Sequence, residues 1–222
     1  ARVEPHHLDA EAISFQISPR LNSAGRMGHA EDSYRLLTTR SVSEAETLAD
    51  TLDQLNRSRR EASDQALTIA FGQIEQKYSG RTLPPILFVG DPGIVPGVAG
   101  LVAGRLAEAY RRPAVAMSIP KSASSKEDTV VASGRSIPQF DIEEAFGSAQ
   151  HLLVKYGGHS QAAGFTVTQE NLPKVISVLS EVAERELADS DLRPALEIDA
   201  EVTLREFTEN AIQWFSHLEP FG

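Results

Sequence analysis

The chain reads Gly90-Asp-Pro-Gly-Ile-Val-Pro-Gly-Val-Ala-Gly-Leu-Val-Ala-Gly-Arg105 directly after the apolar run Ile86-Leu-Phe-Val89. A short apolar run that passes through a glycine-rich turn into a helical pattern is typical of a strand–turn–helix unit. The glycine spacing does not match a dinucleotide-binding fingerprint, so an anion site at this turn is the less favoured alternative. We instead expect close packing against a sheet from three glycines, Gly97, Gly100 and Gly104.

Strand-like and helix-like patterns alternate on both sides of this unit. Further apolar runs occupy residues 114–118, 129–132 and 164–167. Helical spacing covers about 97–110, 141–155 and 171–188. This alternation predicts an α/β fold, with a mixed β-sheet flanked by helices.

A long helix is expected before the sheet. Residues 43–78 contain no proline, and their apolar residues recur at helical spacing. Ser43 followed by Glu46 fits a capping box. Unbroken, the helix is about 54 Å long, which suits a connection between domains. A break near residues 57–60 or at Gly72 is the alternative.

These patterns divide the chain into three regions. Residues 1–80 are the helical region with the connecting helix, and 81–192 are an α/β domain. Residues 193–222 are interpreted as the incomplete start of a further domain, with a strand at 196–202 and a helix at 204–215. Because the chain begins without methionine and ends in a loop-like sequence, we interpret it as a piece of a longer protein.

Composition limits the possible functions. The 222 residues are 41% hydrophobic, which is enough for a sizeable core, and they contain no cysteine, which excludes disulfides, thiolate metal sites and cysteine nucleophiles. The net charge of -10 excludes a protein that coats nucleic acid non-specifically, but not a narrow cleft with a few placed arginines. No secretory signal or apolar run near 20 residues is present, so we expect a cytoplasmic protein without a membrane segment.

Three clusters carry possible phosphate-binding residues. Residues 9–40 are expected to form short helices around a loop with Arg20, Asn22 and Arg26, whose guanidinium groups can form a forked donor set. Ser133 and Arg135 are two residues apart at a strand end, so they project to the same side. For each cluster, an ordinary polar turn or strand end is the alternative.

The third cluster contains paired glycines and a histidine. Gly157 and Gly158 permit close backbone approach, and His159 is expected at the opening of a small helix. Two other features carry less weight. His6-His7 beside Asp9 resembles a metal cluster, but adjacent residues on a helix point in different directions. The arginines of residues 55–60 fit a solvated helix face, with a phosphate-contacting stripe as the minority interpretation.

Together and in this order, the motifs resemble the RecJ exonucleases of the DHH phosphoesterase superfamily. The Gly-Gly-His element is typical of DHH-associated domains in general, and the Pro-Arg-Leu-Asn-x-Ala-Gly-Arg element narrows the resemblance to RecJ-like proteins. The sequence departs from the family pattern at residues 91–95, where a tryptophan and a polar residue are usual. The motifs are Pro19-Arg-Leu-Asn-Ser-Ala-Gly-Arg-Met-Gly28, Leu52-Asp-Gln-Leu-Asn-Arg57, Pro96-Gly-Val-Ala-Gly-Leu-Val-Ala-Gly-Arg-Leu106, Ser133-Gly-Arg-Ser-Ile-Pro-Gln-Phe-Asp141 and Gly157-Gly-His-Ser-Gln-Ala-Ala-Gly164.

The resemblance implies the substrate-binding half of a 5′-to-3′ exonuclease for single-stranded DNA in repair and recombination. In such a protein an N-terminal DHH domain, not found in this sequence, holds Mn2+ or Mg2+, so the chain alone is expected to be inactive and to bind no metal. By motif, Arg20, Asn22 and Arg26 contact the strand, while Ser133 and Arg135 hold the 5′-terminal phosphate. Gly157, Gly158 and His159 lie against the scissile phosphate, with His159 stabilising its charge.

Two other interpretations stay open at this point. The first is a DHH phosphodiesterase for short oligonucleotides or cyclic dinucleotides, which shares the Gly-Gly-His element. The second is a non-catalytic RecJ-like scaffold of a replication complex. The tail ending in Leu218-Glu-Pro-Phe-Gly222 resembles the start of the family's OB-fold domain, for which short-substrate enzymes have no evident use.

Overall fold

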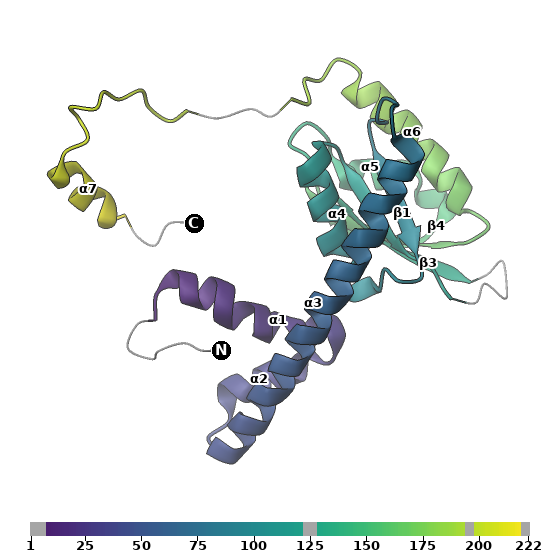
Figure 1. The fold of residues 1–222 in the computed structure, drawn as a ribbon. Coiled ribbons are helices and arrows are strands. Elements are labelled where there is room, and N and C mark those ends of the chain that lie inside the picture. Colours follow the sequence, from purple (N-terminus) through teal and green to yellow (C-terminus); the bar gives the residue numbers. More distant parts are fainter. Residues whose placement is uncertain (1–7, 122–127, 194–197, 219–222) are drawn as a thin grey trace.

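The computed structural model describes residues 8–121, 128–193 and 198–218. Figure 1 shows a helical region and an α/β body, with one long helix that runs from the first to the second. The predicted fold class is confirmed, because a long connecting helix precedes a five-stranded mixed sheet flanked by helices.

The helical region begins with a π-helix, η2 (Ala12–Ile17), which continues into α1 (Ser18–Met27) and is followed by α2 (Ala30–Thr38). The long helix α3 (Val42–Tyr78) has 37 residues without interruption, so a break near residues 57–60 or at Gly72 is excluded.

The predicted start of α3 was wrong by two residues. Ser41 is the N-cap, and its hydroxyl accepts a hydrogen bond from the Glu44 backbone N–H at 3.3 Å, while Ser43 lies inside the helix. The Ser-x-x-Glu pattern occurs at both serines, and the two patterns cannot be distinguished from the sequence alone.

The sheet has the strand order β1-β2-β3-β5-β4. Strands β1 (Leu87–Asp91) and β2 (Ala114–Ser118) are parallel. Strands β3 (Thr129–Arg135), β5 (Ala162–Thr168) and β4 (Leu153–His159) continue the sheet with antiparallel pairing. β4 is therefore an edge strand.

Helices cover both faces of the sheet. α3 and α4 (Pro96–Tyr110) bury one face in an apolar cluster that includes Leu87, Val102 and Ala116. α5 (Ile142–Ser148) and α6 (Leu172–Leu187) bury the other face. Gln73 fixes α3 to β1 by two hydrogen bonds with the Gly90 backbone, at 3.0 and 3.1 Å.

The helix predicted over residues 141–155 is shorter than expected. α5 ends at Ser148, a 3-10 turn η3 (Gln150–Leu152) follows, and β4 begins at Leu153. β4 was not predicted from the sequence, because an exposed edge strand lacks the apolar alternation of a half-buried one.

The tail also differs from the prediction. Among the described residues 198–202 there is no strand, and α7 (Glu209–Ser216) begins five residues later than expected, at a Thr208 cap. A strand needs a neighbour for its backbone hydrogen bonds, and no described strand lies beside this segment. Figure 1 draws α7 apart from the α/β body.

Candidate nucleic-acid interface

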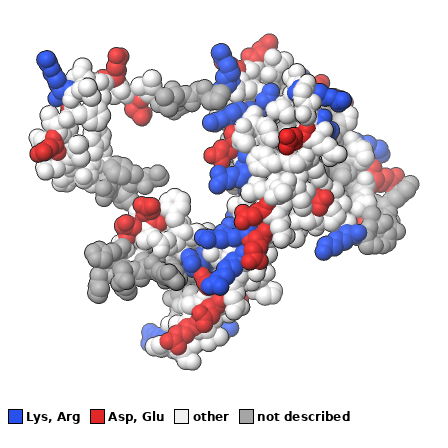
Figure 2. All heavy atoms as spheres, viewed as in Figure 1, with Lys and Arg blue, Asp and Glu red and all other residues white. Residues whose placement is uncertain are grey.

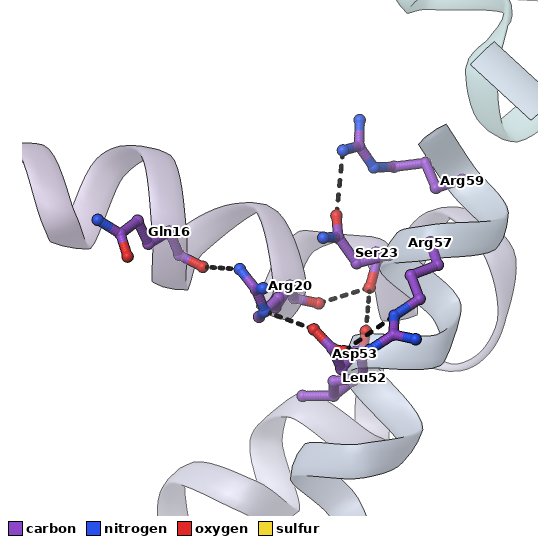
Figure 3. A network of polar contacts seen from close by, with 8 residues as sticks. Gln16, Arg20, Ser23, Leu52, Asp53, Arg57 and Arg59 are labelled. Atoms are coloured by element: carbon purple, nitrogen blue, oxygen red, sulfur yellow. Dashed lines mark hydrogen bonds and ion pairs between the residues drawn. The ribbon is translucent and has the colours of Figure 1, made fainter. Parts of the chain in front are cut away.

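The Arg20–Arg26 segment is a helix, not the loop that the sequence predicted. Figure 3 shows how Arg20 on α1 points toward α3. Its Nε donates to Asp53 Oδ1 at 2.8 Å, and Nη1 donates to the Gln16 carbonyl at 2.5 Å. Asp53 also accepts from Arg57, with Nη2 at 2.7 Å. These hydrogen bonds, first from Arg20 and then from Arg57, hold the pKa of the Asp53 carboxyl below its usual value.

Buried polar contacts complete this joint between α1 and α3. The Ser23 hydroxyl is fully buried and lies 2.6 Å from the Arg20 carbonyl oxygen and 3.2 Å from that of Leu52 (Figure 3). Arg20 is thus a structural residue of the joint. It does not form a forked pair with Arg26, because residues six apart on a helix point in different directions.

Asn22 and Arg26 occupy another face of α1. They are four residues apart, so they lie one turn from each other, and both are exposed. Arg26 Nη1 donates to the Gly97 carbonyl on α4 at 3.3 Å. A Cβ on Gly97 would overlap the Arg26 carbonyl oxygen, so α1 and the N-terminus of α4 are in direct backbone contact. The close packing predicted for Gly97 is therefore against α1, not against the sheet.

The sheet register brings the other predicted residues to one face. Ser133 pairs with Gly164, which pairs with Gly157; Arg135 pairs with Ala162, which pairs with His159. Directly paired residues share a face, so Ser133, Arg135, Gly157 and His159 all lie on the face that carries α4.

Strand β5 lies between β3 and β4, the two strands that carry these residues, and its small side chains form a floor between them. With strands about 4.8 Å apart, the backbones of Arg135 and His159 are about 10 Å from each other. Between them β5 presents only Ala162 and Gly164. A Cβ on Gly157 would have no atom within 4 Å, so the space above this strand is open.

His159 ends a strand and does not open a small helix as predicted. β4 turns directly into β5 through Ser160 and Gln161. This turn is held by the preceding loop: the Ser136 N–H donates to the Gln161 carbonyl at 3.0 Å, and the Ile142 N–H donates to the Ser160 carbonyl at 3.0 Å. His159 itself is exposed.

Gly158 has a backbone requirement of its own. Its φ of +154° is unfavourable for other residues, and a Cβ would overlap the Ala162 carbonyl oxygen and the Ala163 Cα. The two glycines of the motif therefore differ, since Gly158 allows the turn and Gly157 leaves the surface open.

Arg135 is a partly buried guanidinium without a carboxylate partner among the described residues. Its Nη1 donates to the Gly134 carbonyl at 2.8 Å. Burial, and then the charge of Arg26, lowers its pKa. A Cβ on Gly100 would lie 2.8 Å from Arg135 Nη2, and one on Gly104 would lie 3.8 Å from its Cγ. Gly100 therefore makes room for Arg135, as the close-packing interpretation predicted, whereas a Cβ on Gly104 would make only an ordinary van der Waals contact.

Arg135 lines a groove of about 590 Å³ between α3 and α4. The sequence favoured a solvated helix face for the arginines of residues 55–60, yet Arg59 and Arg60 line this groove as well. The available signal was helical spacing, because residues 60, 63, 64 and 67 share one face of α3. The full lining is Arg59, Arg60, Ser63, Asp64, Leu67, Gly100, Leu101, Gly104, Arg105, Glu108 and Arg135.

Some of the arginines around this groove form ion pairs with carboxylates, and others do not. Arg20 and Arg57 pair with Asp53, and Arg105 pairs with Glu108. Within the described part of the chain, no carboxylate lies within 4.0 Å of four others, which are Arg26, Arg59, Arg60 and Arg135. Figure 2 shows basic and acidic side chains interspersed over the visible face, including basic ones where the helical region meets the α/β body. A set of unpaired guanidinium groups is suited to bind an anion.

Metal-binding clusters and membrane-spanning helices are absent from the same residues. Residues 8–121, 128–193 and 198–218 contain no group of three His, Asp or Glu side chains that could hold a metal ion. His6 and His7 lie outside the described residues. No described helix is both long enough and apolar enough to cross a bilayer.

The comparisons with known proteins agree with this geometry. The DHHA1 domain family matches residues 83–185, so the α/β body with its Gly-Gly-His strand is a DHHA1 domain. The single-stranded-DNA-specific exonuclease RecJ of Bacillus subtilis is 33% identical over 212 residues, and that of Thermus thermophilus is 33% identical over 219 residues. Each match covers 96% of this chain. The chain is similar to the RecJ exonucleases over nearly its whole length, as its motifs predicted.

A solved structure supports the same relationship. The crystal structure of RecJ from Thermus thermophilus in complex with Mn2+ matches with a TM-score of 0.80 and 28% identity over 96% of this chain. The chain spans 26% and 29% of the two RecJ relatives and 30% of the solved chain. It therefore corresponds to less than a third of their length.

Proposed function

We propose that this chain is the substrate-binding part of a RecJ-type 5′-to-3′ exonuclease that acts on single-stranded DNA in the cytoplasm. The observation that carries the proposal is the position of the Arg135 side chain. Its partly desolvated guanidinium has no carboxylate partner in the described residues, and it lies on the same sheet face as Ser133, Gly157 and His159. RecJ relatives named as single-stranded-DNA-specific exonucleases support the substrate class.

In this proposal the 5′-terminal phosphate binds to Ser133 and Arg135. The guanidinium donates charge-assisted hydrogen bonds, and the hydroxyl donates one more. The first nucleotides then lie over the floor formed by Ala162 and Gly164, where no large side chain obstructs them. Arg26 contacts the strand from α1, with the exposed Asn22 beside it.

His159 lies about 10 Å from Arg135 across this floor, on the assumption of ordinary strand spacing. We propose that it contacts the phosphate that is cleaved and stabilises the charge that develops there. Gly157 and Gly158 allow the backbone beside it to approach. Arg20 is assigned a positioning role, because its guanidinium already binds Asp53.

Hydrolysis needs metal ligands that the described residues do not supply. The solved RecJ structures are named as complexes with Mn2+ or Mg2+, and such ions activate water for attack on a phosphodiester. We therefore expect the 222-residue chain to bind DNA without degrading it. Manganese-dependent degradation of single-stranded DNA by the purified chain would contradict this expectation.

The terminal-phosphate role is tested by Arg135→Ala. We expect the variant to lose about 10- to 100-fold in affinity for a 5′-phosphorylated strand, because a hydrogen bond to a charged group contributes about 1.5–3 kcal/mol. Affinity for the same strand with a 5′-hydroxyl should fall much less. Fluorescence anisotropy measures both constants.

A matched control is Arg185→Ala, because Arg185 is an arginine on α6, on the opposite face of the sheet. It should leave both affinities unchanged. Equal losses for the two strands in Arg135→Ala would refute the terminal-phosphate role. Tighter binding of dinucleotides than of long strands would favour the short-substrate phosphodiesterase instead.

A further inference from the structure

Arg59 and Arg60 on α3 have no role in the proposal above. Both line the groove that leads away from Arg135. Neither has a carboxylate within 4.0 Å among the described residues, although Arg57, on the same helix, pairs with Asp53 at 2.7 Å. The helix thus carries paired and unpaired arginines within two residues of each other.

Arg59 is held in place by a buried neighbour. Its Nη2 donates to Asn56 Oδ1 at 3.0 Å, and Asn56 is only 2% exposed. The Nε atom is buried and has no hydrogen-bond partner. Arg59 is therefore a fixed, partly desolvated cation, in contrast to a mobile surface arginine.

The charges around Arg59 are mostly of the same sign. Burial lowers its pKa most, followed by Arg60 and Arg26, and only Asp64 acts in the opposite direction. The guanidinium stays protonated, because arginine side chains are not deprotonated in proteins. Placing like charges together without a counter-ion is unfavourable, and an anion bound among them would relieve this cost.

Arg59 lies in the same groove as the terminal-phosphate site, because Arg59 and Arg135 both line it. Arg26 Nη1 donates to the Gly97 carbonyl at the N-terminus of α4, the helix that forms one side of this groove. The charge of Arg26 lowers the pKa of both Arg59 and Arg135. Gly100 leaves room for the Arg135 guanidinium on the α4 side of this groove, whose lining also includes the α4 side chains of Leu101, Arg105 and Glu108.

We propose that Arg59, assisted by Arg60, binds a backbone phosphate of the same strand, downstream of the phosphate held by Arg135. This inference rests on the proposed function and adds a second phosphate contact to it. The ligand is an internucleotide phosphodiester, bound in the groove between α3 and α4 that Arg59, Arg60 and Arg135 line. Because a phosphodiester is the same along any sequence, this contact adds affinity without base preference.

The test compares Arg59→Gln with Arg57→Gln in the full 222-residue chain. Binding of a short 5′-phosphorylated single strand is followed by fluorescence anisotropy at several salt concentrations. We expect Arg59→Gln to weaken binding about 10-fold, as for a lost charge-assisted contact, and to reduce the slope of log K against log salt by about 0.7. The control Arg57→Gln should change neither quantity, because the exposed Arg57 already pairs with Asp53.

A second measurement compares the unmutated chain with Arg59→Gln at single linkages of the strand. Methylphosphonate replaces one internucleotide phosphate at a time and removes its charge. At one linkage, the substitution should weaken binding to the unmutated chain by the same factor as the Arg59→Gln change. The same substitution should not weaken binding to the Arg59→Gln variant any further. Inorganic phosphate and pyrophosphate are added as competitors to detect a site for free anions.

The outcomes separate the two proposals. If the unmutated chain binds the strand but Arg59→Gln equals Arg57→Gln in affinity and salt slope, the Arg59 contact is refuted and the proposed function stands. If no linkage distinguishes Arg59→Gln, or if pyrophosphate binds the groove without displacing the strand, the contact is likewise refuted. If the unmutated chain binds no single strand, the proposed function itself fails.

Discussion

The contact between α1 and α4 makes a sharp prediction at Gly97. A Cβ at this position would overlap the Arg26 carbonyl oxygen and lie 3.0 Å from the Arg26 carbonyl carbon. Because these are backbone atoms, no rotamer change can relieve the overlap, and the two helices must separate. Overpacking of this kind costs about 1–3 kcal/mol, and the better helix propensity of alanine returns at most about 1 kcal/mol.

The expected result for Gly97→Ala is a net loss of about 1–2 kcal/mol. For a chain of this size each kcal/mol lowers Tm by about 2–4 °C, so the Tm should fall by about 2–8 °C. Thermal unfolding followed by circular dichroism measures the shift. The control is Gly72→Ala toward the C-terminal end of α3, where a Cβ meets nothing within 4 Å and alanine should stabilise the helix by about 0.5–1 kcal/mol.

A third variant separates stability from binding. A Cβ on Gly100 would lie 2.8 Å from Arg135 Nη2, which is the movable end of a side chain. Gly100→Ala should therefore keep the Tm close to that of the unmutated chain and reduce the preference for a 5′-phosphate. The reasoning would be refuted if Gly97→Ala melted at or above the temperature of the unmutated chain.

Two further predictions concern the turn and the helical joint. Gly158→Ala should lower Tm and Gly157→Ala should not, because only Gly158 has a positive φ and an overlapping Cβ; equal melting temperatures would contradict this account. Asp53→Asn should destabilise the chain at neutral pH, measured as a lower urea midpoint. Because the folded-state pKa of Asp53 is lowered, its contribution is present above the unfolded value of about 3.9 and is lost as the pH falls through the lower folded value. The difference between the two proteins should therefore shrink below about pH 4, and a difference that persisted there would argue against the Arg20 contact.

Local patterns predicted those elements whose burial follows a simple period. The strands β1 and β2 and the helices α4 and α6 lie close to their predicted ranges, because each buries a stripe or a face that is visible in the sequence. β4 was missed, and the described residues 198–202 of the strand predicted at 196–202 form no strand. An edge strand has little burial to mark it, and an alternating segment forms no strand without a neighbour.

The motifs of the chain also contained the family relationship, since the order of short elements can be recognised without coordinates. Their roles in binding stay predictions. The placement of Arg20 shows the limit of such reasoning: its motif suggested a substrate contact, and the structure gives it Asp53 as a partner.

The amino-acid sequence by itself therefore determined the α/β class, the long helix and the RecJ relationship, since these depend on periodicity and on residues close together in the chain. Only the tertiary structure decided which arginines are paired with carboxylates and which are not. Arg20 and Arg26 share one motif, yet Arg20 binds the Asp53 carboxylate and Arg26 donates to the Gly97 carbonyl on α4 without a carboxylate partner among the described residues. The physical reason is that charge pairing depends on distances between α1, α3 and β3, and those distances arise from packing between segments far apart in the sequence.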